Sequence, residues 1–195
     1  MAKQFIYPFT FGDKSKSDLL GGKGANLAEM VQMGLPVPPG FTITTDACRE
    51  FLTTGVVPAA LNEQIKTALA NLEKTVGKKF GDPTSPLLVS VRSGAKHSMP
   101  GMMETVLNVG ITPEVADAMA KTSGNEKFAQ DSYRRFIDMF GRIVCDLPDE
   151  VVHKVESIYL KKENVNVVAE LSAQSLKALA QDLIQAIEKF TKKPF

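Results

Sequence analysis

Residues 20–30 read LGGKGANLAEM, and residues 89–95 read VSVRSGA. Each segment places one cation, Lys23 in the first and Arg92 in the second, in a glycine-containing turn beside a predicted helix or strand. Glycine lets a backbone approach a ligand closely, a helix start offers unpaired N–H groups to an anion, and Lys or Arg supplies positive charge. Two such turns in one α/β unit predict a binding site for a polyphosphate, most simply ATP.

The composition of the 195-residue chain is that of an ordinary globular protein, with 44% hydrophobic and 23% charged residues. The formal net charge is +1, so no overall field attracts nucleic acid or an anionic membrane. No apolar run approaches the length of a membrane span, and the N-terminus lacks the apolar core of a secretory signal. We therefore expect a cytoplasmic protein with no nucleic-acid or membrane partner.

Short apolar runs and glycines predict an α/β subdomain over residues 1–110. The expected elements are strands at residues 5–7, 41–44 and 105–109, helices at residues 25–33 and 61–76, and a helix capped by Thr45 or Asp46 that ends at Thr53. Residues 87–91 form a nearly continuous apolar run, which is typical of an interior strand in a sheet covered on both faces. Arg92 is expected to close this buried strand.

After Gly110 the apolar residues recur at helical spacing, which predicts an all-helical subdomain at residues 111–195. Thr112 and Ser172 are expected to cap two of its helices. The final helix is expected to bury Leu176, Leu179, Leu183, Ile187 and Phe190. A longer helix that ends before Pro148 is expected to bury Phe128, Ser132, Phe136, Met139, Phe140 and Ile143.

Each of the two cations also has a purely structural interpretation. Residues 20–30, the glycine segment, are not a Walker A loop. That motif begins with a glycine where this chain has Ser17, and it has Ser or Thr after the lysine where this chain has Gly24. Lys23 is then a solvated side chain at a tight turn, and Arg92 a member of a surface or interdomain ion pair. An arginine that ends a buried strand without an anionic partner is costly, however, which favours an anion beside Arg92.

A third segment, residues 96–105, reads KHSMPGMMET. Its Pro-Gly pair marks a turn, and its methionines suit a flat heteroaromatic ring, although filling a core is the more frequent use of methionine. The chain has only two histidines, His97 and His153, and they do not form a pair at metal-ligand spacing. We therefore expect neither a metal site nor a catalytic residue within this chain.

Taken together, these segments resemble the N-terminus of the pyruvate, phosphate dikinase family. The segments that carry the resemblance are residues 19–30 and 89–95 together with GLPVPPGFTITT at 34–45, SMPGMMET at 98–105 and DSYRRF at 131–136. The resemblance extends from about Phe5 to the last residue. Phosphoenolpyruvate synthases share the Gly-Gly-Lys and Val-Arg-Ser elements but carry a more acidic and aromatic segment in place of residues 98–103, so the dikinases are the closer family.

The resemblance implies an ATP-grasp fold for residues 1–110, followed by the helical subdomain. By position, Lys23 and Arg92 match the family's ATP phosphate-binding cations. The other positions that the resemblance assigns to ATP binding are Gly22, Gly24, Ser93, Gly94 and Met103. ATP is expected to arrive with Mg²⁺, and the protein ligands of the metal are expected outside this chain.

The dikinase family converts ATP, phosphate and pyruvate to AMP, pyrophosphate and phosphoenolpyruvate through a phosphohistidine on a swivelling central domain. The partners that the resemblance implies are that central domain, a pyruvate-binding barrel and a second subunit of a homodimeric parent enzyme. The chain has a fraction of the family's length, so we expect a fragment that binds ATP phosphates at most and is inactive alone. The alternatives are a phosphoenolpyruvate synthase-like dikinase and a free-standing, non-catalytic nucleotide-binding or interaction module.

Overall fold

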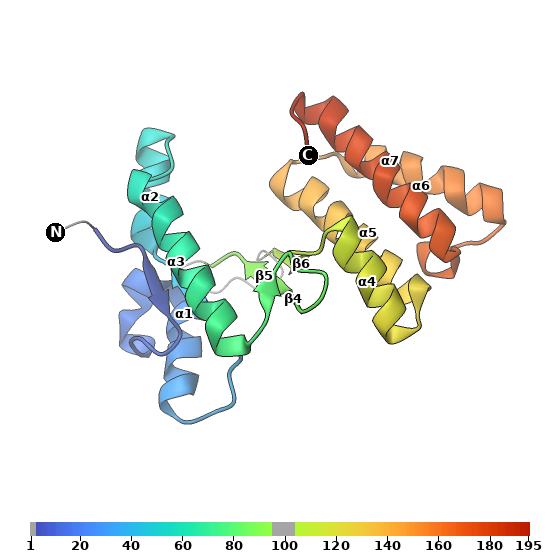
Figure 1. Cartoon of the computed structure of the whole chain (residues 1–195). Helices are drawn as coiled ribbons and strands as arrows, with labels where there is room; N and C mark the ends of the chain where they lie inside the picture. Colours follow the sequence, from blue (N-terminus) through green and yellow to red (C-terminus); the bar gives the residue numbers. More distant parts are fainter. Residues whose placement is uncertain (1–2, 95–103) are drawn as a thin grey trace. The chain divides into compact units, whose positions relative to one another are not determined.

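A computed structural model describes residues 3–94 and 104–195, which divide into two compact units (Figure 1). The first unit holds residues 3–78 with 93–94, and the second holds residues 79–92 with 104–195. Both units combine helices with small two-stranded sheets, so the chain has a mixed helix and sheet architecture. The domain boundary at residue 110 and the ATP-grasp assignment stay predictions.

The first unit packs its helices against one antiparallel pair of strands, in which Tyr7 lies opposite Thr42. Pro8 ends the first strand, because proline has no N–H to donate to a neighbouring strand. The elements of this unit are β1 (Ile6–Pro8), η1 (Lys14–Lys16), α1 (Ser17–Gln32), β2 (Phe41–Ile43), α2 (Thr45–Thr54) and α3 (Ala59–Val76). The strands and helices predicted in this region are confirmed, and most of their ends differ by one or two residues. The exception is α1, which begins at Ser17 rather than at the predicted residue 25.

The two faces of the β1–β2 sheet contact different helices, because successive side chains of a strand point to opposite faces. Ile6 is buried and clusters with Ala47 of α2 and Leu61 of α3. Tyr7, its neighbour in the chain, packs instead against Leu20 and other buried residues of α1. The sheet therefore holds α1, which carries the glycine segment, on the face opposite α3.

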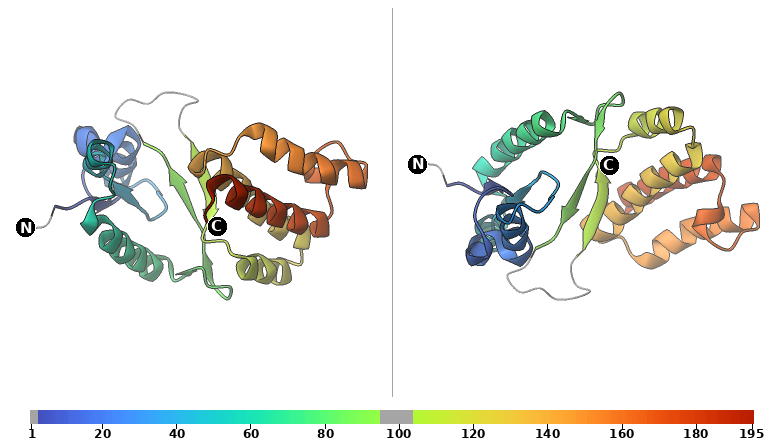
Figure 2. Two further views of the ribbon diagram at one scale, coloured as in Figure 1. Left: turned by 90° about the horizontal axis from the view of Figure 1, so that it is seen from above. Right: turned by 90° about the horizontal axis from the view of Figure 1, so that it is seen from below.

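The second unit places four helices on one side of the β5–β6 sheet (Figure 2). Its elements are β3 (Lys79–Phe80), β4 (Pro86–Leu87), β5 (Val89–Arg92), β6 (Thr105–Val109), α4 (Pro113–Ser123), α5 (Glu126–Val144), α6 (Asp149–Glu163), η2 (Val168–Glu170) and α7 (Ala173–Thr191). From residue 110 to 195, all of which the structure describes, the regular elements are helices. Among the described parts of the chain, no helix has both the length and the apolar character needed to cross a membrane.

Helix α7 supplies much of the core of the second unit. Leu176, Leu179, Leu183 and Ile187 are buried, as predicted. Phe190 was expected on the same face, but it lies in the last turn of α7 with 48% of its surface exposed, so this part of the prediction is wrong. The predicted cap is confirmed, because the Ser172 hydroxyl accepts a hydrogen bond from the N–H of Ser175; Thr112 likewise caps α4.

The predicted buried face of α5 is wrong. Phe128 is 54% exposed, and the residues that α5 buries include Tyr133, Ile137 and Gly141. Gly141 faces α7 so closely that a Cβ atom there would lie 3.0 Å from Cδ1 of Ile187. Helix α5 contacts α4, α7 and β6, so it buries residues on more than one of its faces. Phe136 and Phe140 are only partly buried at the edge of this surface.

The prediction of an interior strand at residues 87–91 is also wrong. The run is divided between β4, which pairs with β3, and β5, which pairs with β6 and is irregular between Val89 and Val91. Among residues 3–94 and 104–195, each of these sheets has two strands, so β5 pairs there with β6 alone. Leu87 is buried, whereas Val91 is 55% exposed. The apolar run reflects two short strands rather than one strand covered on both faces.

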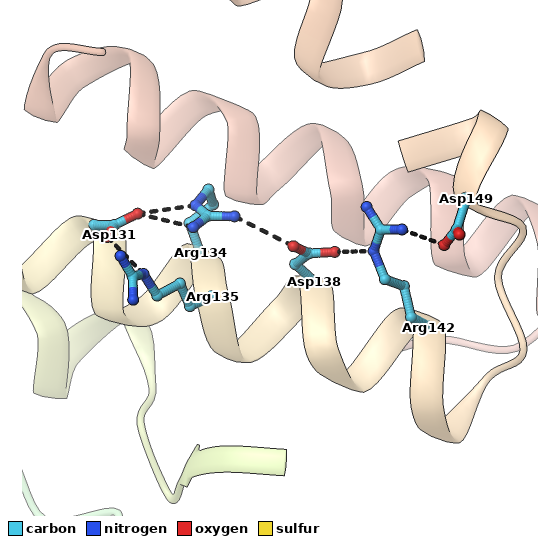
Figure 3. A network of polar contacts seen from close by, with 6 residues as sticks. All are labelled: Asp131, Arg134, Arg135, Asp138, Arg142 and Asp149. Atoms are coloured by element: carbon cyan, nitrogen blue, oxygen red, sulfur yellow. Dashed lines mark hydrogen bonds and ion pairs between the residues drawn. The ribbon is translucent and has the colours of Figure 1, made fainter. Parts of the chain in front are cut away.

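A ladder of charged residues runs along α5 (Figure 3). Nε and Nη2 of Arg134 donate to Oδ1 of Asp131 at 3.0 and 2.9 Å, and Nη1 of Arg134 donates to Asp138 at 3.3 Å. Arg142 then joins Asp138 to Asp149, the first residue of α6. Because the Arg134 side chain is only 9% exposed, its charge needs these partners. The ladder thereby fixes the start of α6 against the end of α5.

Two further polar contacts attach α7 to its neighbours. Lys177 donates to Asp117 of α4 at 2.8 Å, and this hydrogen bond lowers the pKa of the Asp117 carboxyl. Tyr159 of α6 donates its hydroxyl to Asp182 at 2.6 Å. Burial, followed by this contact with a carboxylate, raises the pKa of Tyr159 to about 12. The tyrosine therefore remains a neutral hydrogen-bond donor at neutral pH.

Alanine substitutions at two positions of α7 will compare a buried residue with a half-exposed one. We expect Leu183→Ala to lower the free energy of unfolding by about 2–5 kcal/mol, because it leaves a cavity between packed helices. Phe190→Ala on the same helix removes a larger side chain, yet should cost about 1 kcal/mol or less, because its ring is half exposed. Urea unfolding followed by circular dichroism measures both changes. Equal costs would contradict the placement of Phe190.

Candidate functional site

Helix α1 is interrupted at Gly21, two residues before Lys23. Gly21 has φ 68° and ψ 165°, a left-handed conformation that glycine adopts without the steric cost of a side chain. The helix resumes after this residue, so Lys23 lies in the first turn of its second part, as the sequence predicts. Backbone N–H groups in the first turn of a helix lack acceptors within the helix, and such a turn suits an anion.

Lys23 connects the two segments that the sequence singles out. Its Nζ donates to the carbonyl oxygen of Ser93 at 3.1 Å, and the two residues are 70 positions apart in the chain. Both belong to the first unit. A lysine ammonium has three N–H donors, so this contact leaves donors for a further acceptor. The glycine segment and the turn at residues 93–94 therefore lie side by side.

Arg92 and Ser93 belong to different units, although they are neighbours in the chain. Arg92 ends β5 with an exposed side chain. The argument that Arg92 ends a buried strand is therefore wrong, because an exposed guanidinium is hydrated and needs no buried anion. That Lys23 and Arg92 bind the phosphates of one nucleotide stays a prediction.

The glycines of the predicted site differ in what surrounds them. A Cβ atom at Gly24 would lie 2.8 Å from both Cγ2 and Oγ1 of Thr42 in β2. No real Cβ makes such contacts without displacing a neighbour, so Gly24 is required for the close packing of α1 on the sheet. A Cβ atom at Gly94, by contrast, would meet nothing within 4 Å. Gly22 is partly buried, and the ligand contacts predicted for these glycines stay predictions.

The third predicted segment lies largely outside the described residues. Met103, predicted to lie near the nucleotide, is among residues 95–103, as is His97. His153 is exposed on α6. Within residues 3–94 and 104–195, no three His, Cys, Asp or Glu side chains gather into a group that could hold a metal ion.

The structure adds two residues that sequence reasoning did not assign to the site. Nη2 of Arg49 donates to the carbonyl oxygen of Asp18 at 3.0 Å, and the Thr45 hydroxyl donates to the same oxygen. Thr45 was expected as a possible cap of α2, but the cap position is Thr44, whose side chain makes no capping bond. The only sequence signal for this pair is its i, i+4 spacing on α2.

A cavity of about 760 Å³ lies in the first unit, away from these residues. Its walls come from β1, β2, α3, the end of α1 and the proline-containing loop before β2, with Phe41 and Leu72 among the apolar lining residues. None of the predicted ATP-binding residues that the structure describes contributes to its walls. The cavity and the glycine segment are therefore separate features.

Comparison with known proteins identifies similar sequences. The profile of a family described as "Pyruvate phosphate dikinase, AMP/ATP-binding domain" matches residues 17–67 and 52–135, which together cover more than half of the chain. A protein named "Pyruvate, phosphate dikinase" from Entamoeba histolytica is 48% identical over 98% of this chain. Proteins of the same name from Clostridium symbiosum and Rhizobium meliloti are 47% and 44% identical over 93% and 100% of the chain.

These relatives are much longer than the present chain. The aligned region makes up 22% of the Entamoeba protein, 21% of the Clostridium protein and 22% of the Rhizobium protein. The chain thus spans about a fifth of the length of the curated relatives it matches. The matched stretch includes α1, α2 and the whole of β5 and β6.

Substitution of Gly24 will test whether packing requires this glycine. We expect Gly24→Ala to destabilise the chain by about 1–3 kcal/mol through its clash with Thr42, although alanine is the better helix former. When Thr42→Ala removes both clashing atoms, the additional Gly24→Ala change should cost little. Gly94→Ala serves as the control and should leave the unfolding midpoint unchanged. If Gly24→Ala costs the same in both backgrounds, contact with Thr42 is not the reason for the glycine.

Proposed function

Because the chain belongs to the family of the pyruvate phosphate dikinase AMP/ATP-binding domain, we propose that it binds ATP through its glycine segment and the turn at residues 93–94. The observation that carries this proposal is the contact of Lys23 with Ser93, 3.1 Å long, which joins the two segments. Each segment alone can be explained by the fold without a ligand. The two segments meet at the Lys23 ammonium, which has N–H donors left after its contact with Ser93. This arrangement favours an anionic ligand shared by both segments.

The proposed roles follow from the chemistry of a polyphosphate. Lys23 and Arg92 contact phosphate oxygens and neutralise their charge, while Gly22 and the turn at Ser93 offer backbone N–H groups. Met103 is assigned by the family resemblance to a position near the nucleotide, where its polarisable sulfur would suit a flat heteroaromatic ring. Phosphoryl transfer depends mainly on positioning and electrostatic stabilisation, which such residues supply without covalent chemistry.

We assign the whole reaction only to a longer protein that contains this chain. There, ATP, phosphate and pyruvate would be converted to AMP, pyrophosphate and phosphoenolpyruvate through a phosphohistidine. This chain would hold the nucleotide, and a central phosphohistidine domain, a pyruvate-binding barrel and a second subunit would be its partners. Mg²⁺ accompanies ATP and supplies charge at the phosphates, and residues outside this chain complete its coordination.

Removal of either cation should weaken ATP binding. We expect Lys23→Met and Arg92→Met each to raise the dissociation constant roughly 10- to 150-fold, because a charge-assisted contact is worth about 1.5–3 kcal/mol. Equilibrium dialysis with labelled ATP measures the change. In the longer protein, the same substitutions should abolish ATP-dependent AMP formation and spare the exchange of pyruvate with phosphoenolpyruvate.

Lys66→Met is the matched control for these variants. Lys66 is an exposed lysine of α3 that pairs with Glu63 on the same helix, at 2.7 Å. Its loss changes the net charge by the same amount as the loss of Lys23 and should leave ATP binding unchanged. Unaltered binding in both Lys23→Met and Arg92→Met would remove the proposed phosphate site.

The chain incubated alone with ATP and Mg²⁺ should release no AMP and form no phosphoenzyme. Phosphoryl transfer needs metal ions that bridge the phosphates and a positioned acceptor. An open site also leaves the phosphates hydrated, which weakens the stabilisation that Lys23 and Arg92 provide. Intact-mass measurement after incubation is the test. Stoichiometric, acid-labile phosphate on His97 or His153 would show that this chain is catalytically competent by itself.

A further inference from the structure

We propose that Thr45 and Arg49 are positioning residues for Lys23 and act through the backbone carbonyl of Asp18. The inference rests on the nucleotide site proposed above and adds to it the feature that fixes its lysine in place. Neither residue belongs to the glycine segment or to the turn at residues 93–94. Both lie in α2, whose first turns contact α1.

The carbonyl of Asp18 needs a donor because of the conformation of Gly21. In an uninterrupted helix, the N–H of residue 22 would donate to the carbonyl of residue 18. Gly21, with φ 68° and ψ 165°, lies within that turn, and these non-helical dihedral angles are incompatible with its regular hydrogen bond. An unpaired carbonyl at this point would cost free energy or allow the first part of α1 to fray.

Helix α2 supplies the donors that the interruption requires. The Thr45 hydroxyl and Nη2 of Arg49 both donate to the carbonyl oxygen of Asp18. Nη2 of Arg49 also donates to Oγ1 of Thr45 at 2.8 Å, so the hydroxyl is oriented by the guanidinium while it donates to the carbonyl. The three groups form a closed set of hydrogen bonds between one backbone oxygen and two side chains.

This arrangement fixes α1 on both sides of Gly21. Before Gly21, the Asp18 carbonyl is hydrogen-bonded to Thr45 and Arg49. After Gly21, Gly24 packs directly on Thr42, with room for no Cβ atom. Both attachments come from the short stretch that runs from Thr42 in β2 to Arg49 in the second turn of α2. The backbone of Lys23 is therefore held between two fixed points, which spares ATP the cost of ordering it.

Arg49 acts here through hydrogen bonds rather than as a third phosphate cation. Its side chain is 65% exposed, and Nη2 lies 3.7 Å from the carboxylate of Asp46, which offsets its charge. Asp46→Asn should therefore leave ATP binding near its original strength, since it removes neither donor to Asp18. A substantial gain in affinity on removal of Asp46 would instead identify Arg49 as a direct contact of the nucleotide and overturn the positioning role.

The decisive experiment is a double-mutant cycle on ATP binding by the full chain. Thr45→Val removes the hydroxyl and preserves the shape of the side chain, and we expect the dissociation constant to rise about 3- to 10-fold. Thr45→Ser keeps the hydroxyl and should restore binding. In a chain that already carries Lys23→Met, Thr45→Val should have almost no further effect, because the residue it positions is gone.

The outcomes separate this proposal from the proposed function. If Lys23→Met weakens binding and Thr45→Val does not, the nucleotide site stands and the positioning role is overturned. Equal effects of Thr45→Val with and without Lys23 would also overturn it, because they show that Thr45 acts independently. If Lys23→Met itself has no effect, the positioning role is overturned, and the proposed phosphate site is overturned as well only if Arg92→Met also leaves binding unaltered. If Thr45→Val lowers the unfolding temperature below that of the assay, Arg49→Gln replaces it in the same cycle with Lys23→Met, because Arg49 is exposed.

Discussion

The contact between Gly24 and Thr42 is the constraint on which the geometry of the glycine segment depends. A side chain at residue 24 would push α1 away from β2 and would displace Lys23, its neighbour in the chain. The glycines of this segment therefore have different tasks. Gly21 provides the left-handed interruption, Gly24 provides the close approach, and Gly22 stands directly before the lysine. A glycine-rich signature thus serves backbone geometry and close packing, independently of any ligand.

Local signals predicted where α2 and α3 end, because a helix C-terminus can depend on a single residue. Gly55 and Gly77 adopt left-handed conformations and end α2 and α3, as glycine beyond a helix commonly does. The face of α7 also followed from its leucine spacing. The buried face of α5 did not, since it depends on three contacting elements that the sequence of α5 does not reveal. The exposure of Val91 depends in the same way on how many strands border β5.

In the candidate site, too, features that depend on neighbouring residues in the sequence were predicted, whereas contacts between distant residues were not. Lys23 was found because its glycine neighbours form a recognisable pattern, and its contact with Ser93 joins the two predicted segments. Thr45 and Arg49 were not assigned to it, because their partner is a backbone oxygen and backbone groups leave no signature in a sequence. The need for these donors arises from the dihedral angles of Gly21. Only coordinates reveal such angles.

The first unit is built from two separate segments of the chain, and this affects the order in which the protein can fold during synthesis. The polypeptide leaves the first unit after residue 78, forms β3 to β5 of the second, and returns at Ser93. On a ribosome, α1 to α3 emerge and pack early, whereas the acceptor for Lys23 emerges only after those strands. The first unit is therefore the first to begin folding, yet the contact at its candidate site must wait for part of the second.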